Sequence, residues 1–262
     1  MAPRKKSNAI WWILGAFAAV AVIGVGLVVM FIVLASLSNS NTNLNANTRN
    51  ENHNSNVAVN ANVSNSNTNA TVAPASLTDD FSAQKWGIGN SPYGRIWYDD
   101  GEYHMSSKER TFVVMYAPSD AYNTENATVK VTARSVDGEA PSAGFGLMVH
   151  CAQSKAKQLE DYALLIYPTD EPEYEIIKHK DGNQSAVVTK TKSSAIHSGS
   201  TPNTLEIRIQ GTQLTFYVNG QYLTRITDTE NFRRGRAGLY TSDSHEVAFD
   251  DLSINRQSTN AN

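Results

Sequence analysis

Hydrophobic and polar residues alternate along two adjacent stretches of the chain, and this pattern restricts the fold more than any other feature of the sequence. Leu205, Ile207 and Ile209 alternate with polar residues, and the same pattern resumes over 214–218. An Asn-Gly pair follows at 219–220, which is the strongest short signal for a hairpin turn. Period-two alternation interrupted by turn residues predicts antiparallel strands with one buried face.

Similar patterns recur through 77–256 at a spacing typical of a β-sandwich, and no stretch of this region shows a convincing helical period. Residues 162–167 are apolar on both faces, which predicts a central strand. In the last strand Val247 and Phe249 are in phase, but the apolar residues from 252 onward are displaced by one position. A β-bulge at 250–251 would restore the register. The sequence therefore predicts an all-β, antiparallel domain over 77–256, which is long enough to bury a core.

The strand expected over 144–151 contains the single cysteine of the chain, so no internal disulfide is possible. Strict alternation puts Cys151 on the face of Phe145, Leu147 and Val149, and puts His150 on the opposite face. We therefore expect Cys151 to be a buried, unreactive thiol.

Residues 9–35 form an apolar run without a charged or polar side chain, longer than the ~20 residues that cross a bilayer. Three basic residues at 4–6 precede it, and the next positive charge is Arg49. The positive-inside rule then puts 1–8 in the cytoplasm and the rest of the chain outside. A cleaved signal peptide is the alternative, but its apolar core is normally about 7–15 residues. We expect an uncleaved signal-anchor helix, with the lipid bilayer as a partner.

Residues 36–76 form a predicted disordered linker, since fourteen of the residues in 38–76 are Asn and hardly any is a large apolar residue. Residues 257–262 are a short polar tail that we also expect to be disordered. The region 77–256 carries 18 Lys and Arg against 24 Asp and Glu, and this acidic balance argues against nucleic acid as a partner. The Asn-rich linker and the lack of disulfides favour a bacterial envelope over a eukaryotic surface.

A family resemblance rests on turn glycines, core positions and a closing strand: Asp80-Phe81, Gly144-Phe145-Gly146-Leu147, Asn203-x-Leu205, Gly211-x-x-Leu214, Tyr217-Val218-Asn219-Gly220, Gly235-x-x-Gly238-Leu239 and Val247-x-Phe249-Asp250-Asp251-Leu252. This set resembles concanavalin A-like jelly-roll domains, above all the laminin-G-like branch and the bacterial 3-keto-disaccharide hydrolase-like domains. The resemblance implies a jelly-roll β-sandwich over nearly all of 77–256. It leaves the function open, because this fold serves lectins, enzymes and interaction modules.

The acidic run Glu171-Pro172-Glu173-Tyr174-Glu175 is similar to the acidic triple of jelly-roll glucanases. In retaining enzymes of that kind two carboxyl groups lie about 5–5.5 Å apart and act as nucleophile and acid/base. The middle acid of the glucanase pattern is Asp rather than Glu, and Pro172 interrupts strand pairing. We therefore expect no catalytic residue, and we keep Glu173 and Glu175 as the alternative pair for a glycoside hydrolase of the 3-keto-disaccharide or glucanase type.

Sugar-binding sites combine an aromatic ring with polar hydrogen-bonding side chains. The candidates for such a site are Trp97, Tyr98, His150, Tyr174, Glu175 and Lys178. Each aromatic residue could equally belong to the core, and His150 could equally be a plain surface residue. The first hypothesis is a non-catalytic binding module for carbohydrate or another envelope component. The alternatives are the glycoside hydrolase and a structural or protein-interaction domain.

Neither a metal nor a cofactor is expected. The acidic pairs at 99–100 and 250–251 lack the spacing of a calcium loop, and the chain has no glycine-rich phosphate loop or zinc spacing. The Arg233-Arg234-x-Arg236 cluster either meets an anionic ligand or is solvated charge. The sequence leaves the ligand and the oligomeric state open.

Overall fold

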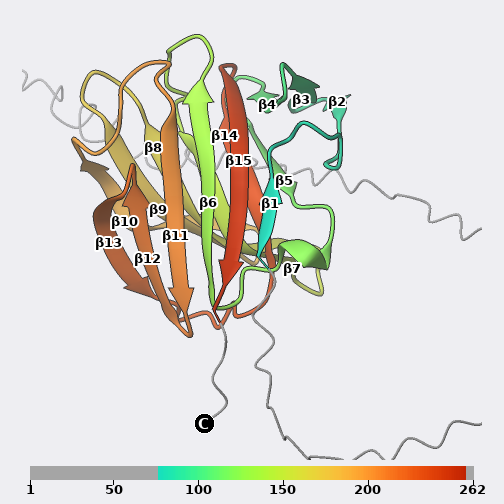
Figure 1. The fold of residues 1–262 in the computed structure, drawn as a ribbon, viewed down its shortest axis with the longest axis vertical. Helices are drawn as coiled ribbons and strands as arrows, with labels where there is room; N and C mark the ends of the chain where they lie inside the picture. Colours follow the sequence, from blue (N-terminus) through green and yellow to red (C-terminus); the bar gives the residue numbers. More distant parts are fainter. Residues whose placement is uncertain (1–75, 258–262) are drawn as a thin grey trace, which may run out of the picture.

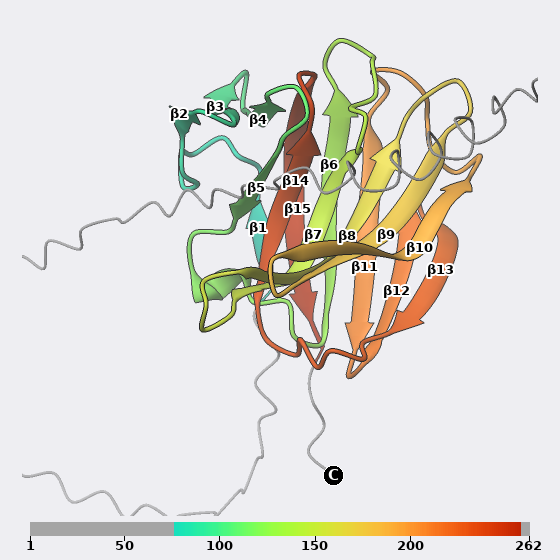
Figure 2. The same cartoon turned by 180° about the vertical axis from the view of Figure 1, so that it is seen from behind.

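The computed structural model describes residues 76–257, which form two antiparallel sheets packed face to face (Figures 1 and 2). This arrangement confirms the predicted all-β sandwich. The predicted segments 1–8 and 9–35, the linker 36–76 except its last residue, and the tail beyond 257 lie outside the described residues. Within 76–257 no helix is long and apolar enough to cross a membrane.

The larger sheet faces the viewer in Figure 1 and has nine strands. Its order is β13 (Gln221–Thr227), β12 (Gln213–Val218), β11 (Asn203–Gln210), β6 (Ala127–Ser135), β15 (Glu246–Arg256), β4 (Glu102–Ser107), β3 (Gly94–Asp99) and β2 (Gly89–Ser91), and β1 (Leu77–Asp79) pairs with β15. Short turns join β2 to β3, β3 to β4, β11 to β12 and β12 to β13. The turn between β12 and β13 is the one that the Asn-Gly pair at 219–220 predicts.

The smaller sheet has six strands and is seen in front in Figure 2. Its order is β10 (Asn183–Lys192), β9 (Glu173–Lys180), β8 (Leu159–Tyr167), β7 (Phe145–Gln153), β14 (Arg236–Ser242) and β5 (Phe112–Tyr116). A single 3-10 turn of the described region, η1 (Asp120–Tyr122), follows the edge strand β5. Strand β8 lies between two neighbours and is buried on both faces, which confirms the prediction of a central strand.

The main core fills the space between the two sheets. The alternating apolar residues of β11 and β12 are all fully buried there, and Phe81 and Trp86 belong to the same core. A second apolar cluster lies on the other face of the six-stranded sheet. Met148 of β7 and Tyr240 of β14 belong to this cluster. Along each of these strands they alternate with the residues that face the main core.

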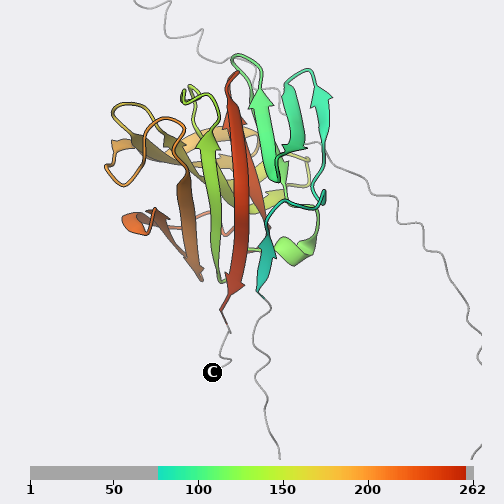
Figure 3. The ribbon, with the colours of Figure 1, turned by 45° about the horizontal axis from the view of Figure 1, so that its top comes forward.

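Strand β15 bends where the sequence predicts a bulge. The register with β6 shifts between Asp250 and Ser253, and Asp251 has a left-handed φ of 51°. This shift returns Leu252 and Ile254 to the core, which confirms the predicted bulge. The start of the domain lies beside its end, because Leu77 of β1 pairs with Ile254, and Figure 3 shows β1 and η1 next to the lower half of β15.

A register shift in β7 makes the predicted strict alternation of this strand wrong after Val149. His150 has a left-handed φ of 58°, and the pairing with β8 shifts between Val149 and Ala152. Cys151 is therefore not on the face of Phe145 and the core, but joins the second apolar cluster with Met148. The thiol is buried as expected, and burial raises its pKa well above the ordinary value, so it stays protonated.

Candidate functional site

A cavity of about 550 Å³ lies where three strand ends of the six-stranded sheet meet. The end of β5, the end of β7 and the start of β14 are brought together because β14 pairs antiparallel with both of the others. This volume is within the range of small-molecule sites. The cavity is lined by Gly87, Met115, Tyr116, Ala117, Pro118, Asp120, Asn123, Cys151, Ala152, Gln153, Arg234, Gly235 and Arg236.

The polar wall of this first cavity is built on Arg236. Its Nε atom donates to Asp120 Oδ1 at 2.9 Å, and its Nη1 atom donates to the carbonyl of Ala117 at 3.3 Å. Asn123 forms an isolated backbone bridge with Arg236, so the η1 segment is fastened to the start of β14. These contacts leave Asn123, Gln153 and Arg234 as further polar groups of the lining.

Tyr116 supplies the aromatic wall. Its hydroxyl lies 3.4 Å from the carbonyl of Ala152 and 3.3 Å from Asp161 Oδ2, and it donates to these acceptors. Burial and the neighbouring Asp161 charge raise the pKa of the Tyr116 phenol far above its usual range. The phenol therefore stays protonated, and the ring is held in place at the edge of the sheet.

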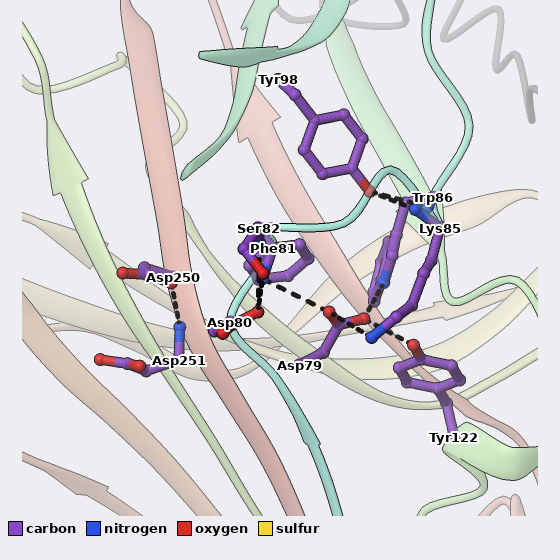
Figure 4. Close-up of polar contacts among 10 residues, drawn as sticks. All are labelled: Asp79, Asp80, Phe81, Ser82, Lys85, Trp86, Tyr98, Tyr122, Asp250 and Asp251. Atoms are coloured by element: carbon purple, nitrogen blue, oxygen red, sulfur yellow. Dashed lines mark hydrogen bonds and ion pairs between the residues drawn. The ribbon is translucent and has the colours of Figure 1, made fainter. Parts of the chain in front are cut away.

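A buried carboxylate connects two segments that adjoin the lining of the cavity, and Figure 4 shows its polar contacts. Asp79 of β1 accepts hydrogen bonds from Trp86 Nε1 at 3.1 Å and from the Tyr122 hydroxyl at 2.5 Å, and Lys85 Nζ lies 3.2 Å away. Tyr122 belongs to η1, and Trp86 immediately precedes Gly87 of the lining. The Asp79 side chain has no exposed surface, so this network is part of the interior.

A second cavity, of about 420 Å³, shares Ala152 and Arg234 with the first. It is lined by Glu125, His150, Ala152, Glu160, Asn231, Phe232, Arg233 and Arg234. Burial lowers the pKa of His150 to about 4, although the charge of Asp228 acts in the opposite direction. The imidazole is therefore neutral at neutral pH, and its Nε2 atom has no hydrogen-bond partner.

The structure distributes the other predicted sugar-binding residues over separate places. Trp97 lies on the outer face of the nine-stranded sheet, stacked on His104 at 5.4 Å between ring centroids. Tyr98 points to the opposite side, where its hydroxyl accepts the backbone N–H groups of Trp86 and Lys85. The two aromatic residues therefore do not form one platform.

The three predicted sugar-binding residues of β9 also lie in different surroundings. Tyr174 faces the main core, and Lys178 pairs with Glu230. Glu175 is on the other face and accepts a hydrogen bond from Tyr167 at 2.7 Å. Glu173 shares that outer face, but neither acid lines either of the two cavities. Of the predicted set, only His150 lines a cavity described here.

The residues that sequence reasoning missed come from segments far apart in the chain. Tyr116, Asp120, Asn123 and Gln153 had no recognisable motif, because their proximity depends on the pairing of β14 with β5 and β7. The only available signal was the arginine cluster over 233–236, which the structure places between the two cavities. Within 76–257 no group of three or more His, Cys, Asp or Glu side chains is placed to hold a metal ion.

Two buried histidines should give the stability of the domain opposite pH dependences. The pKa of His150 falls from 6.5 to about 4 on folding, so its stabilising effect is complete above pH 6.5 and is lost as the pH falls towards 4. This loss amounts to about 3 kcal/mol. For His179, desolvation lowers the pKa, but the Asp161 carboxylate 2.7 Å from Nδ1 outweighs it and raises the pKa above 6.5. The His179 contribution is therefore present at low pH and is lost as the pH rises through the raised value.

Urea unfolding of the full chain between pH 4 and pH 9 would measure both effects. We expect His150→Asn to be less sensitive than the wild type between pH 6.5 and 4, and His179→Gln to lose stability mainly on the acidic side, where the charged pair with Asp161 exists. Curves of the two variants that run parallel to the wild type would contradict the assignment.

Comparison with known proteins identifies the fold. Neither a protein-family model nor a curated protein matches the sequence. Many solved structures are similar to the chain, and three of them illustrate the likeness. The carbohydrate-binding module CBM66 from Bacillus subtilis matches 64% of this chain and 94% of its own at 14% identity, with a TM-score of 0.51. A protein of unknown function with a galectin-like fold, also from Bacillus subtilis, matches 71% of this chain and 99% of its own at 12% identity, with a TM-score of 0.50.

A β-glucanase from Bacillus licheniformis matches 70% of this chain and 98% of its own at 9% identity, with a TM-score of 0.51. Identities this low establish the fold alone. The domain has the jelly-roll fold that the resemblance to concanavalin A-like domains implied.

Proposed function

We propose that this chain is a membrane-anchored module that binds carbohydrate outside the cytoplasm, with residues 9–35 as its anchor and the jelly roll as its binding domain. The anchor rests on the length of the apolar run and on the basic residues at 4–6. The binding activity rests on the first cavity. The single observation that carries it is that an aromatic residue, Tyr116, lines the same concave site as a set of amide and guanidinium groups.

The composition of the first cavity suits recognition of a sugar. Tyr116 and Pro118 provide apolar surface for the face of a sugar ring, and Asn123 and Gln153 can each donate and accept hydrogen bonds. Sites of this kind bind small polar ligands through a few oriented polar groups on an apolar wall. Among the similar folds, one is a carbohydrate-binding module and one is a β-glucanase, so this architecture supports both binding and hydrolysis.

Binding without hydrolysis fits the acids of the first cavity better than catalysis. A glycoside hydrolase of the usual kind needs two carboxyl groups on either side of the scissile bond. The first cavity contains one acid, Asp120, which is paired with Arg236. Glu173 and Glu175, the alternative catalytic pair, are absent from its lining.

The test is a binding measurement on Arg234→Ala. Arg234 lines both cavities, its side chain is 84% exposed, and its ion partner Glu125 lies 3.5 Å away. Exposed pairs of this kind contribute little to stability, so we expect an unchanged melting temperature. Loss of its charge-assisted hydrogen bonds to the sugar should weaken binding about tenfold.

The measurement uses the full chain in a detergent without a sugar head group, screened against a broad oligosaccharide panel by thermal shift and calorimetry. Arg110→Ala is the matched control, because Arg110 is 90% exposed, forms an ion pair with its neighbour Glu109 and lines neither cavity. Equal loss of affinity in both variants would disprove the proposed site. Consumption of a bound sugar by the wild type, abolished in the Glu173→Gln/Glu175→Gln double variant, would favour the hydrolase instead.

A further inference from the structure

We infer that the two cavities form one cleft for a neutral saccharide of at least two sugar units, with His150 Nε2 accepting a hydroxyl of the second unit. The inference rests on the proposed function and specifies its ligand. The cavities share Ala152 and Arg234, so a ligand that fills the first and extends past these residues enters the second.

We assign the proton of His150 to one ring nitrogen from the hydrogen bonds around it. The hydroxyl of Thr124 lies 3.1 Å from the carbonyl of Gly235, to which it can donate its single hydrogen, and it accepts the backbone N–H of His150 at 2.9 Å. The Nδ1 atom of His150 lies 3.3 Å from the same hydroxyl, which then has only an acceptor site left. In this assignment Nδ1 carries the hydrogen and donates it to Thr124, and Nε2 is an acceptor.

A second acceptor lies near this imidazole. Asp228 Oδ1 accepts hydrogen bonds from the Tyr162 hydroxyl and from the backbone N–H groups of Glu230 and Asn231. The Oδ2 atom of Asp228 and the Nε2 atom of His150 are both buried, and neither has a hydrogen-bond partner. The two side chains interact electrostatically. His150 is 1% exposed and is one of the residues that line the second cavity. Unpartnered buried polar atoms are costly, and two acceptors require a donor.

The charges of the joint cleft favour a neutral donor over an anion. Its arginines, Arg233, Arg234 and Arg236, are balanced by the acids Asp120, Glu125 and Glu160. A carboxylate or phosphate on the ligand would meet these acids and the acceptor atoms near His150. Sugar hydroxyls satisfy both sides, because they donate to Nε2 and to the acids and accept from the arginines.

The test measures the affinity of the full chain for saccharides of one to four units, in a detergent without a sugar head group. The probes are neutral gluco-, xylo- and fructo-oligosaccharides, and oligogalacturonides of equal length. We expect the wild type to bind a neutral disaccharide about tenfold more tightly than its monosaccharide, and the oligogalacturonides more weakly. His150→Asn should remove the gain with length and keep the monosaccharide affinity. Asn tolerates the left-handed backbone at this position, so the substitution is compatible with the fold.

His197→Asn is the matched control, because His197 is exposed and lines neither cavity, and it should keep the gain with length. Nitrogen-15 NMR of the imidazole in the wild type gives a readout that needs no variant: the Nε2 resonance should have the shift of an unprotonated nitrogen and should move with the disaccharide but not with the monosaccharide.

Each other outcome overturns a defined claim. A protonated Nε2, an affinity independent of length, or a gain that survives in His150→Asn would overturn the role of His150, leaving a buried water as its partner. Tighter binding of oligogalacturonides would overturn the neutral ligand. If no saccharide of any length binds, the proposed function itself fails, and the inference fails with it.

Discussion

Asp79→Ala should destabilise the domain by about 3–5 kcal/mol, the cost of breaking a buried charged network. The substitution removes the acceptor of Trp86 Nε1 and of the Tyr122 hydroxyl, and it leaves the Phe81 N–H, 3.3 Å from Asp79 Oδ1, without that contact. Urea unfolding of the full chain measures the effect, and a melting temperature lower by roughly 10 °C should accompany it. Because Trp86 and Tyr122 adjoin the first cavity, saccharide binding should weaken as well.

Asp80→Ala is the neighbouring control. The Asp80 carboxylate is exposed and accepts local hydrogen bonds from the hydroxyl and the backbone N–H of Ser82. We expect it to cost less than about 1 kcal/mol. Similar losses for the two variants would show that Asp79 is not the group that ties β1 to η1.

Gly235→Ala should be the second severe substitution, costing about 3 kcal/mol through overpacking against the backbone. A Cβ atom at this position would lie 2.7 Å from the backbone nitrogen of Cys151 and nearer still to the carbonyl group of His150. Backbone atoms cannot rotate away as the end of a side chain can, so the 233–236 segment or the β7 bulge must move. Both movements displace cavity walls, and we expect saccharide binding to be lost together with stability.

Gly211→Ala is the control that distinguishes a steric clash of the new Cβ atom from the backbone effect of replacing any glycine. Gly211 has a positive φ of 57° but open space around a Cβ atom, so Ala there should cost only about 1–2 kcal/mol. Thermal unfolding and a saccharide titration of both variants decide the case. A Gly235→Ala protein with wild-type binding would show that the segment is not held against His150.

Local patterns in the sequence were sufficient for much of the fold. The alternation over β11 and β12 and the phase change in β15 both predicted the observed burial, because each depends only on which residues of one strand must reach the core. The same rule failed in β7. Nothing in the run around His150 shows that a left-handed residue interrupts the register and sends Cys151 to the opposite face.

The candidate site was predictable only in part. His150 and the arginines of 233–236 were identified as candidates from their chemistry, but the ring on which a sugar would lie, Tyr116, was not. Trp97 and Tyr98 were chosen as neighbours in sequence, and neighbours on a strand point to opposite faces. Glu173 and Glu175 do share a face, as their spacing predicts, yet that face is not part of the cavity lining.

Hydrophobic period and turn residues act over a few residues, so they were enough to predict the all-β class, the faces of β11 and β12 and the bulge in β15. The membrane anchor and the linker stay predictions from the same kind of signal. Only the tertiary structure decided which strand ends meet. The first cavity arises because β14 pairs with both β5 and β7, which brings Met115 and Tyr116 next to Arg236, more than a hundred positions away in the sequence. Such proximity depends on sheet order, and no local pattern encodes it.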